Sequence, residues 1–235
     1  MASTIRPMAG STGGGRRARP WVIGLLVAAV AAAAAPATIL AATPDPILLV
    51  HGYRGAPSTW ADMIANFKAK GRTAVAIDLA TEDNVKNAAQ IRDFIAAKGW
   101  ARADIVAQSM GGLSARQYIK FLGPTVVDTY VSLGTPQYGI SAACLLPWWY
   151  GGQMCPSSSF LRDLNNGDDT PGEVYWTTIY SRRDGVVPTS ASRLDGGACF
   201  VYEDPGVGHN SMDNDAKIFK HVLAAVDRDC AGTFK

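Results

Sequence analysis

Short apolar runs alternate along the chain with longer segments in which apolar residues recur at the spacing of a helix. The runs cover residues 47–50, 73–79, 103–107, 126–133, 174–180 and 199–202. Their continuous apolar character is typical of strands buried on both faces. Helical patterns cover residues 59–70, 84–99, 113–122 and 213–227. Ser58-Thr59 and Asn84 are the expected N-caps of the first two helices. The alternation predicts an α/β fold with a doubly wound, mostly parallel sheet of about six strands.

The stretch 134–172 interrupts this alternation. It is rich in Gly, Pro, Ser and Asn, and it carries Trp148-Trp149-Tyr150 between Cys144 and Cys155. We expect an excursion over the edge of the sheet and not a second domain. The apolar run 145–150 has two interpretations: a flap that touches lipid or lines a substrate pocket, or a segment buried against the sheet.

The first 42 residues have the three parts of a secretory signal. A basic stretch, residues 16–19, precedes an apolar run from Trp21 to Ala35, and Ala35-Pro36-Ala37 supplies the small residues of a cleavage site. The sequence predicts a signal peptide over residues 1–42, cleaved after Ala37 or Ala42. Export by the twin-arginine route is one alternative, suggested by Arg16-Arg17. An uncleaved anchor spanning residues 21–42 is another.

Charge and cysteine content add two constraints. Removing the four arginines of the leader changes the formal net charge from +2 to −2, so the remainder lacks the basic excess typical of nucleic-acid binding. All four cysteines follow the leader, and in an oxidising compartment an even number favours disulfides. Of the three pairings, we favour Cys144–Cys155 and Cys199–Cys230. The first closes a short loop, and the second ties a late strand to the C-terminus.

Metal and cofactor sites are not indicated. The sequence contains no CxxC pair, and its three histidines are scattered at positions 51, 209 and 221. We therefore expect neither a metal nor a cofactor.

The strongest chemical signal is Ala107-Gln108-Ser109-Met110-Gly111-Gly112, which joins a predicted strand to a predicted helix. A nucleophilic serine on such a strained turn needs small residues two positions before and after it, because larger side chains would collide there. Ala107 and Gly111 meet this requirement. On its own, the pattern also fits a tight turn with a capping serine.

The remaining residues of a serine hydrolase site follow in the expected order, Ser, then Asp or Glu, then His. His209 lies in a loop after the last predicted strand, whereas His221 lies within the final helix. Asp184 follows the strand 174–180 and is the expected acid. Asp195 is one rival, and Asp204, five residues before His209, is another.

Two backbone N–H groups would bind the oxyanion of a tetrahedral intermediate. The first belongs to Met110, immediately after the serine. The second belongs to Tyr53, in the loop that follows the first strand, where Gly52 and Gly55 allow the backbone to approach closely.

These motifs together resemble the small secreted bacterial lipases of the lipase class 2 family. They are residues 50–52, 107–112, 183–188 and 206–209, and the resemblance covers residues 46 to 225. It implies an α/β-hydrolase catalytic domain over residues 43–235, catalytic roles for Ser109, Asp184 and His209, oxyanion N–H groups from Tyr53 and Met110, no metal and a minimal lid. Two features depart from the family: Gln108 stands where histidine is frequent, and the insertion 139–166 is longer than a lidless lipase needs.

The expected function is that of a secreted, monomeric carboxylic ester hydrolase, a lipase or esterase acting on triacylglycerols or on short and medium acyl esters. It would meet its substrate in solution or at a lipid–water interface, with no stable membrane span after processing. A thioesterase, an acyltransferase or a polyester depolymerase would use the same residues, because fold and triad do not set the acyl group or its acceptor. A secreted binding protein of the same fold without activity is the alternative from another class.

Overall fold

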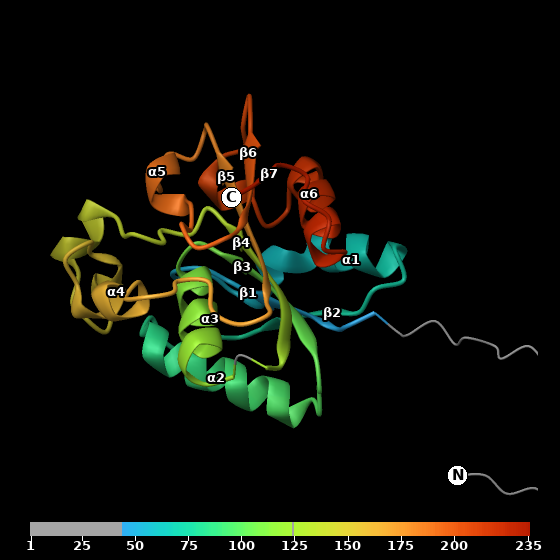
Figure 1. Cartoon of the computed structure of the whole chain (residues 1–235), viewed down its shortest axis with the longest axis horizontal. Coiled ribbons are helices and arrows are strands. Elements are labelled where there is room, and N and C mark those ends of the chain that lie inside the picture. The colour runs from blue at the N-terminus through green and yellow to red at the C-terminus, as the bar shows by residue number, and fades with distance from the viewer. Residues whose placement is uncertain (1–43, 124) are drawn as a thin grey trace, which may run out of the picture. The chain divides into compact units, whose positions relative to one another are not determined.

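The computed structural model describes residues 44–123 and 125–235 (Figure 1). The predicted signal peptide and its two cleavage sites, after Ala37 or Ala42, lie outside the described residues. Within those two ranges, no helix combines the length and apolar character needed to cross a membrane.

A seven-stranded sheet forms the centre of the described part. Its order is β2-β1-β3-β4-β5-β6-β7; the first six strands run parallel, and β7 is antiparallel to β6. The strands are β1 Ile47–Val50, β2 Ala74–Ile77, β3 Ala103–Gln108, β4 Val127–Leu133, β5 Tyr175–Ser181, β6 Cys199–Glu203 and β7 Thr233–Phe234. The prediction of a mostly parallel, doubly wound sheet is confirmed. The added strand β7 has only two exposed residues, too few to give a sequence pattern.

Helices cover both faces of the sheet (Figure 1). On one face, α1 (Ala61–Ala69) and α6 (Ala216–Val226) pack together through Phe67 and Phe219, whose rings are 5.1 Å apart. On the other face, α2 (Asn84–Ala97) and α3 (Met110–Phe121) bury their apolar sides against β1, β3 and β4. The fully buried strand β1 lies between these two layers, as its unbroken apolar sequence requires.

The N-caps of the first two helices differ from those predicted, and α6 begins three residues later than expected. Asp83, and not Asn84, caps α2, because its carboxylate accepts the N–H groups of Val85 and Lys86. A short 3-10 helix, η1 (Pro57–Trp60), precedes α1, so Ser58-Thr59 caps nothing. Helix α6 starts at Ala216 behind the capping Asp215.

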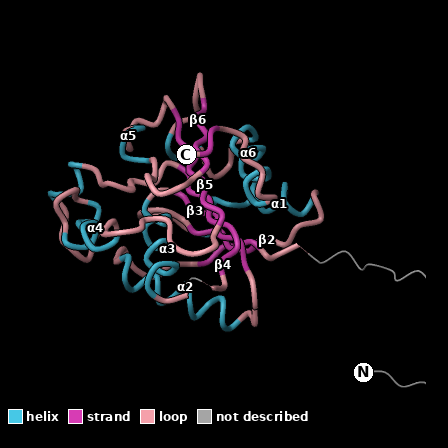
Figure 2. Tube along the Cα trace, viewed as in Figure 1, coloured by secondary structure: helices cyan, strands magenta, loops and turns pink. Residues whose placement is uncertain are grey.

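The segment between β4 and β5 leaves the sheet and extends to one side as short helices and loops (Figure 2). It contains the 3-10 helices η2 (Ser141–Leu145) and η3 (Gly152–Met154) and the helix α4 (Ser159–Leu164). Their buried side chains form a separate apolar cluster with Met110 and Leu113 of α3. The apolar side chains of these short helices therefore pack against the start of α3.

Both expected disulfides are present. Cys144 is bonded to Cys155, with their Cα atoms 4.6 Å apart, and Cys199 is bonded to Cys230, with a Cα separation of 5.6 Å. The preferred pairing is therefore confirmed.

Candidate active site

Ser109 occupies a strained turn between β3 and α3. Its backbone torsions are φ 54° and ψ −130°, a conformation that side-chain-bearing residues rarely adopt. Close packing holds this turn: a Cβ on Gly52 would lie 2.8 Å from the Cβ of Ser109, and one on Gly111 would lie 2.7 Å from the Val50 carbonyl oxygen. The serine hydroxyl makes no capping hydrogen bond to α3. The alternative of a capping serine is therefore wrong.

His209 meets Ser109 from the far end of the sequence. It begins the short 3-10 helix η4 (His209–Ser211), in the segment that follows β6. Its Nε2 atom lies 2.9 Å from the Oγ atom of Ser109, and the whole residue is only 8% exposed. An imidazole at this distance accepts the hydroxyl proton when Nε2 is unprotonated.

Asp184 lies on the other side of the imidazole, in the loop after β5. Its Oδ2 atom is 2.8 Å from Nδ1 of His209. Its other oxygen, Oδ1, accepts the N–H groups of Val186 at 2.9 Å and Val187 at 2.8 Å. The carboxylate is thus fixed at both oxygens, and it requires the proton of the neutral imidazole to be on Nδ1.

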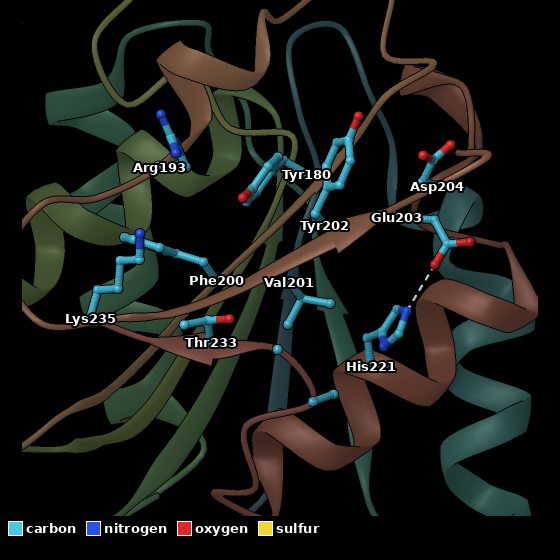
Figure 3. A pocket seen from close by; sticks show the side chains of 12 residues that line it. Tyr180, Arg193, Phe200, Val201, Tyr202, Glu203, Asp204, His221, Thr233 and Lys235 are labelled. Atoms are coloured by element: carbon cyan, nitrogen blue, oxygen red, sulfur yellow. Dashed lines mark hydrogen bonds and ion pairs between the residues drawn. The ribbon is translucent and has the colours of Figure 1, made fainter.

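The rival residues lie elsewhere. His221 of α6 is 2.9 Å from Glu203. Both residues line a cavity at the β6–β7 edge of the sheet, and the lining of this cavity includes no serine or cysteine (Figure 3). Asp204 pairs with Arg182 on the surface. Asp195 is exposed, and its main-chain N–H donates to the hydroxyl of Tyr138.

The two residues expected to supply the oxyanion N–H groups both lie beside the serine. Met110 is the first residue of α3, where the N–H groups have no acceptor within the helix. Tyr53 lines the same cavity as Ser109. The buried ring of His51 fixes the loop of Tyr53: Nε2 accepts the N–H of Leu79, and Nδ1 donates to the carbonyl of Gly52, each at 3.0 Å.

Two further residues hold the site together and were missed by sequence reasoning. The buried side chain of Gln108 donates from Nε2 to the carbonyl oxygen of His209 at 3.2 Å. At the end of β5, the hydroxyl of Ser181 bonds to both backbone groups of Val207 and accepts the N–H of Arg183. It thereby connects the loop of Asp184 to the loop of His209. Burial at a strand end was the available signal for Ser181, but many structural serines share it.

The environment also affects two neighbouring carboxyl groups. Burial raises the pKa of Asp213, while the Thr59 hydroxyl and the charge of His209 act in the opposite direction. Burial likewise raises the pKa of Glu82, which accepts the N–H of Arg54 beside the Tyr53 loop. Both groups are thus more readily protonated than an exposed carboxyl.

A cavity of about 370 Å³ opens above the serine. Ser109 and His209 supply its reactive polar surface, and Gln108 and Asn210 lie beside them. The apolar wall consists mainly of residues from the excursion and one from the Asp184 loop: Ile140, Ala142, Ala143, Leu146, Met154 and Val186. Such a cavity accommodates an apolar group next to the serine hydroxyl.

Solved structures similar to this chain include bacterial lipases and esterases. The chain is similar to the mature form of a Bacillus licheniformis lipase, with a TM-score of 0.65 and 18% identity over 79% of this chain and 93% of that one. It is similar also to an esterase from Exiguobacterium antarcticum, with a TM-score of 0.61 and 14% identity over 79% of this chain and 92% of that one. These similarities identify the fold as that of the α/β hydrolases.

Sequence similarity identifies the family. A triacylglycerol lipase from Burkholderia plantarii is 26% identical over 152 residues, which cover 59% of this chain and 39% of that relative. The chain thus spans well under two thirds of the length of that lipase. Residues 44–217 match the family described as lipase (class 2). The chain therefore belongs to the class 2 lipase family, and it has the α/β-hydrolase fold.

Proposed function

We propose that this protein hydrolyses carboxylic esters through an acyl-enzyme intermediate, with Ser109 as nucleophile, His209 as general base and acid, and Asp184 as the acid that orients His209. The observation that supports this assignment is the unbroken hydrogen-bonded series Asp184–His209–Ser109 at the base of an apolar cavity. Serine hydrolases need this series because a free hydroxyl is a weak nucleophile near neutral pH.

The reaction proceeds in two halves. Nε2 of His209 takes the proton from Ser109 as Oγ attacks the ester carbonyl carbon, and the N–H groups of Tyr53 and Met110 bind the resulting oxyanion. The bond to the alcohol oxygen breaks, and His209 gives its proton to the leaving alcohol. Water then attacks the acyl-enzyme with His209 again as base, which releases the carboxylic acid and restores the serine.

Replacing the nucleophile tests the proposal directly. We expect Ser109→Ala to keep the circular dichroism spectrum of the folded protein, to lose at least 10³-fold in kcat on p-nitrophenyl butyrate, and to resist labelling by a fluorophosphonate probe. Ser190→Ala, at an exposed position in the short helix α5 (Thr189–Ser192), is the matched control and should be labelled like the parent. Full labelling and turnover in Ser109→Ala would place the nucleophile elsewhere.

The natural substrate is proposed to be a triacylglycerol or a short to medium acyl ester. The apolar wall of the cavity supports an aliphatic acyl group, as does the similarity to lipases and esterases. A chain-length series of nitrophenyl esters, compared with emulsified triacylglycerol, measures the preference. Faster turnover of acyl thioesters than of all oxygen esters would instead favour a thioesterase.

Export to the outside of the cell is part of the same proposal. The signal-like residues 1–42 and the two disulfides support it, because disulfides persist in oxidising compartments. N-terminal sequencing of protein collected from the culture medium tests it, with Thr38 or Thr43 as the expected first residue. Recovery of the chain only in the cell fraction, with its leader intact, would contradict export.

A further inference from the structure

One long segment of the chain carries no charge. Between Asp128 and Arg162 the sequence contains no Asp, Glu, Lys, Arg or His, although charged residues make up 18% of the whole chain. The middle of this stretch includes the loop 140–155, which η2, η3 and the Cys144–Cys155 disulfide hold together. A surface loop without charges cannot attract a partner by ion pairing.

The loop 140–155 nevertheless presents large apolar side chains to solvent. Leu145 is 90% exposed and Trp149 is 64% exposed, and Trp148 and Tyr150 are also exposed. Trp148 extends this surface toward α2 and α3, since it lines a shallow groove with Val85 and Phe121. Scattered apolar residues are ordinary on protein surfaces, but neighbouring exposed ones mark interaction sites.

Covalent and hydrogen bonds hold the backbone of this loop in place. The disulfide closes the loop, and the fully buried Gln153 bonds to the Asn84 N–H at 2.7 Å and to the Asp83 carboxylate at 2.9 Å. Within the loop, the N–H groups of Tyr150 and Gly152 donate to the carbonyl of Pro147. The backbone that carries Leu145 and Trp149 is thus fixed at the surface, which lowers the entropic cost of docking.

The inner side of the same loop is a wall of the reaction cavity. Ala143, Leu146 and Met154 line that cavity with Ser109 and His209. The ring of Tyr150 contacts the ring of Tyr53 edge-on, with centroids 5.6 Å apart. Whatever the outer side of the loop contacts therefore lies beside the entrance to the serine.

We propose that the loop 140–155 docks on the surface of uncharged or zwitterionic lipid, with Leu145 and Trp149 inserted at the level of the head groups. This inference rests on the proposed function, since it places an ester-lipid aggregate against the cavity of Ser109. Indole side chains favour the membrane–water interface, and an amphipathic surface binds lipid in proportion to the apolar area that it buries. The absence of charge from the loop favours neutral lipid over acidic head groups.

Binding to vesicles tests the docking surface without depending on hydrolysis. The probe is phosphatidylcholine vesicles, and the protein is the Ser109→Ala chain, which should bind lipid without consuming it. We expect Leu145→Ser with Trp149→Ser to lower the vesicle partition coefficient at least tenfold in a sedimentation assay. Phe234→Ser, which removes an exposed apolar residue of β7, is the matched control and should leave the coefficient unchanged.

Activity assays on the chain with Ser109 intact separate docking from catalysis. The double variant should hydrolyse soluble p-nitrophenyl butyrate within twofold of the parent rate, and emulsified tributyrin at least fivefold more slowly. Inactivity of the parent on every ester would overturn the proposed function but not the vesicle result.

Three results would overturn the docking proposal. One is equal vesicle binding by the parent and the double variant. Another is binding that needs phosphatidylglycerol and disappears in 0.5 M salt, since screening would then reveal charge attraction. The last is a parent dimer in analytical ultracentrifugation that the double variant converts to monomer, which would assign the surface to a second copy of the chain.

Discussion

At the scale of single residues, the two oxygens of Asp184 have separate partners. Oδ1 accepts two backbone N–H groups, whereas Oδ2 accepts the Nδ1 proton of His209. Every partner is a donor when the imidazole is neutral, so the site requires a group that accepts on both sides. A carboxylate meets this requirement, and a side-chain amide does not.

We therefore expect Asp184→Asn to lower kcat by about 10²–10⁴-fold. The amide NH₂ group would face either the two backbone donors or His209, and in the latter case it favours the tautomer in which Nε2 carries the proton and cannot accept that of Ser109. KM should change little, because Asp184 does not line the cavity. Steady-state kinetics on a nitrophenyl ester measure both values.

Asp195→Asn is the matched control for this prediction. The side chain of Asp195 is exposed, and the residue is held through its main-chain N–H, which the substitution keeps. Its kcat should stay within twofold of the parent. If the loss of activity instead follows Asp195→Asn, the acid must be reassigned.

At the scale of elements, the sequence predicts the starts of strands more accurately than the starts of helices. The run Ile47–Val50 coincides with β1, because a short unbroken apolar run before a glycine-containing loop is typical of a strand buried on both faces. The sequence places the start of α3 at Leu113, three residues late, because Met110-Gly111-Gly112 lacks helical periodicity. In the structure this turn is helical, and its glycines pack closely, Gly111 on the backbone of Val50 and His51 and Gly112 on the side chain of Thr135. The contacts of Gln108 and Ser181 were not predictable, because each joins segments at least 26 residues apart in sequence.

The C-terminal disulfide is expected to support the edge of the sheet and not the chemistry. Cys199 begins β6, and Cys230, 31 residues later, follows α6. Closing a loop of this length restricts the unfolded chain, so Cys199→Ala with Cys230→Ala should lower the free energy of unfolding by about 3–4 kcal/mol. Urea denaturation measures this change.

The control for the disulfide prediction is the activity of the variant at urea concentrations too low to unfold it. Neither Cys199 nor Cys230 lines the cavity of Ser109, so kcat/KM of the folded variant should equal that of the parent within twofold. A loss of kcat/KM without a loss of stability would show that this edge of the sheet influences the site.

At the scale of the whole described domain, the two ends of the parallel sheet have different electrostatics. The carboxyl ends of β3, β5 and β6 lead to Ser109, Asp184 and His209, as expected for an open α/β sheet. At the opposite end, Asp104 of β3 is buried, and its carboxylate lies 3.1 Å from the guanidinium of Arg72. Asp45 and Asp128 lie close to it, and both pair with Arg102.

This buried carboxyl should make the stability of the protein depend on pH. Burial raises the pKa of Asp104 from 3.8 to about 7; Arg72 and Thr129 oppose the shift, and Asp45 and Asp128 add to it. The folded state holds the proton of Asp104 more tightly than the unfolded state does. The contribution of this group to the stability of the fold is therefore fully present below pH 4 and is lost as the pH rises to about 7. The prediction concerns the difference in free energy of unfolding between the parent and Asp104→Asn. This difference, parent minus variant, should fall over this pH interval by at most about 4 kcal/mol, because each pKa unit corresponds to about 1.4 kcal/mol. Urea denaturation at each pH measures the difference; a difference that rises with pH would mean that pairing with Arg72 outweighs burial.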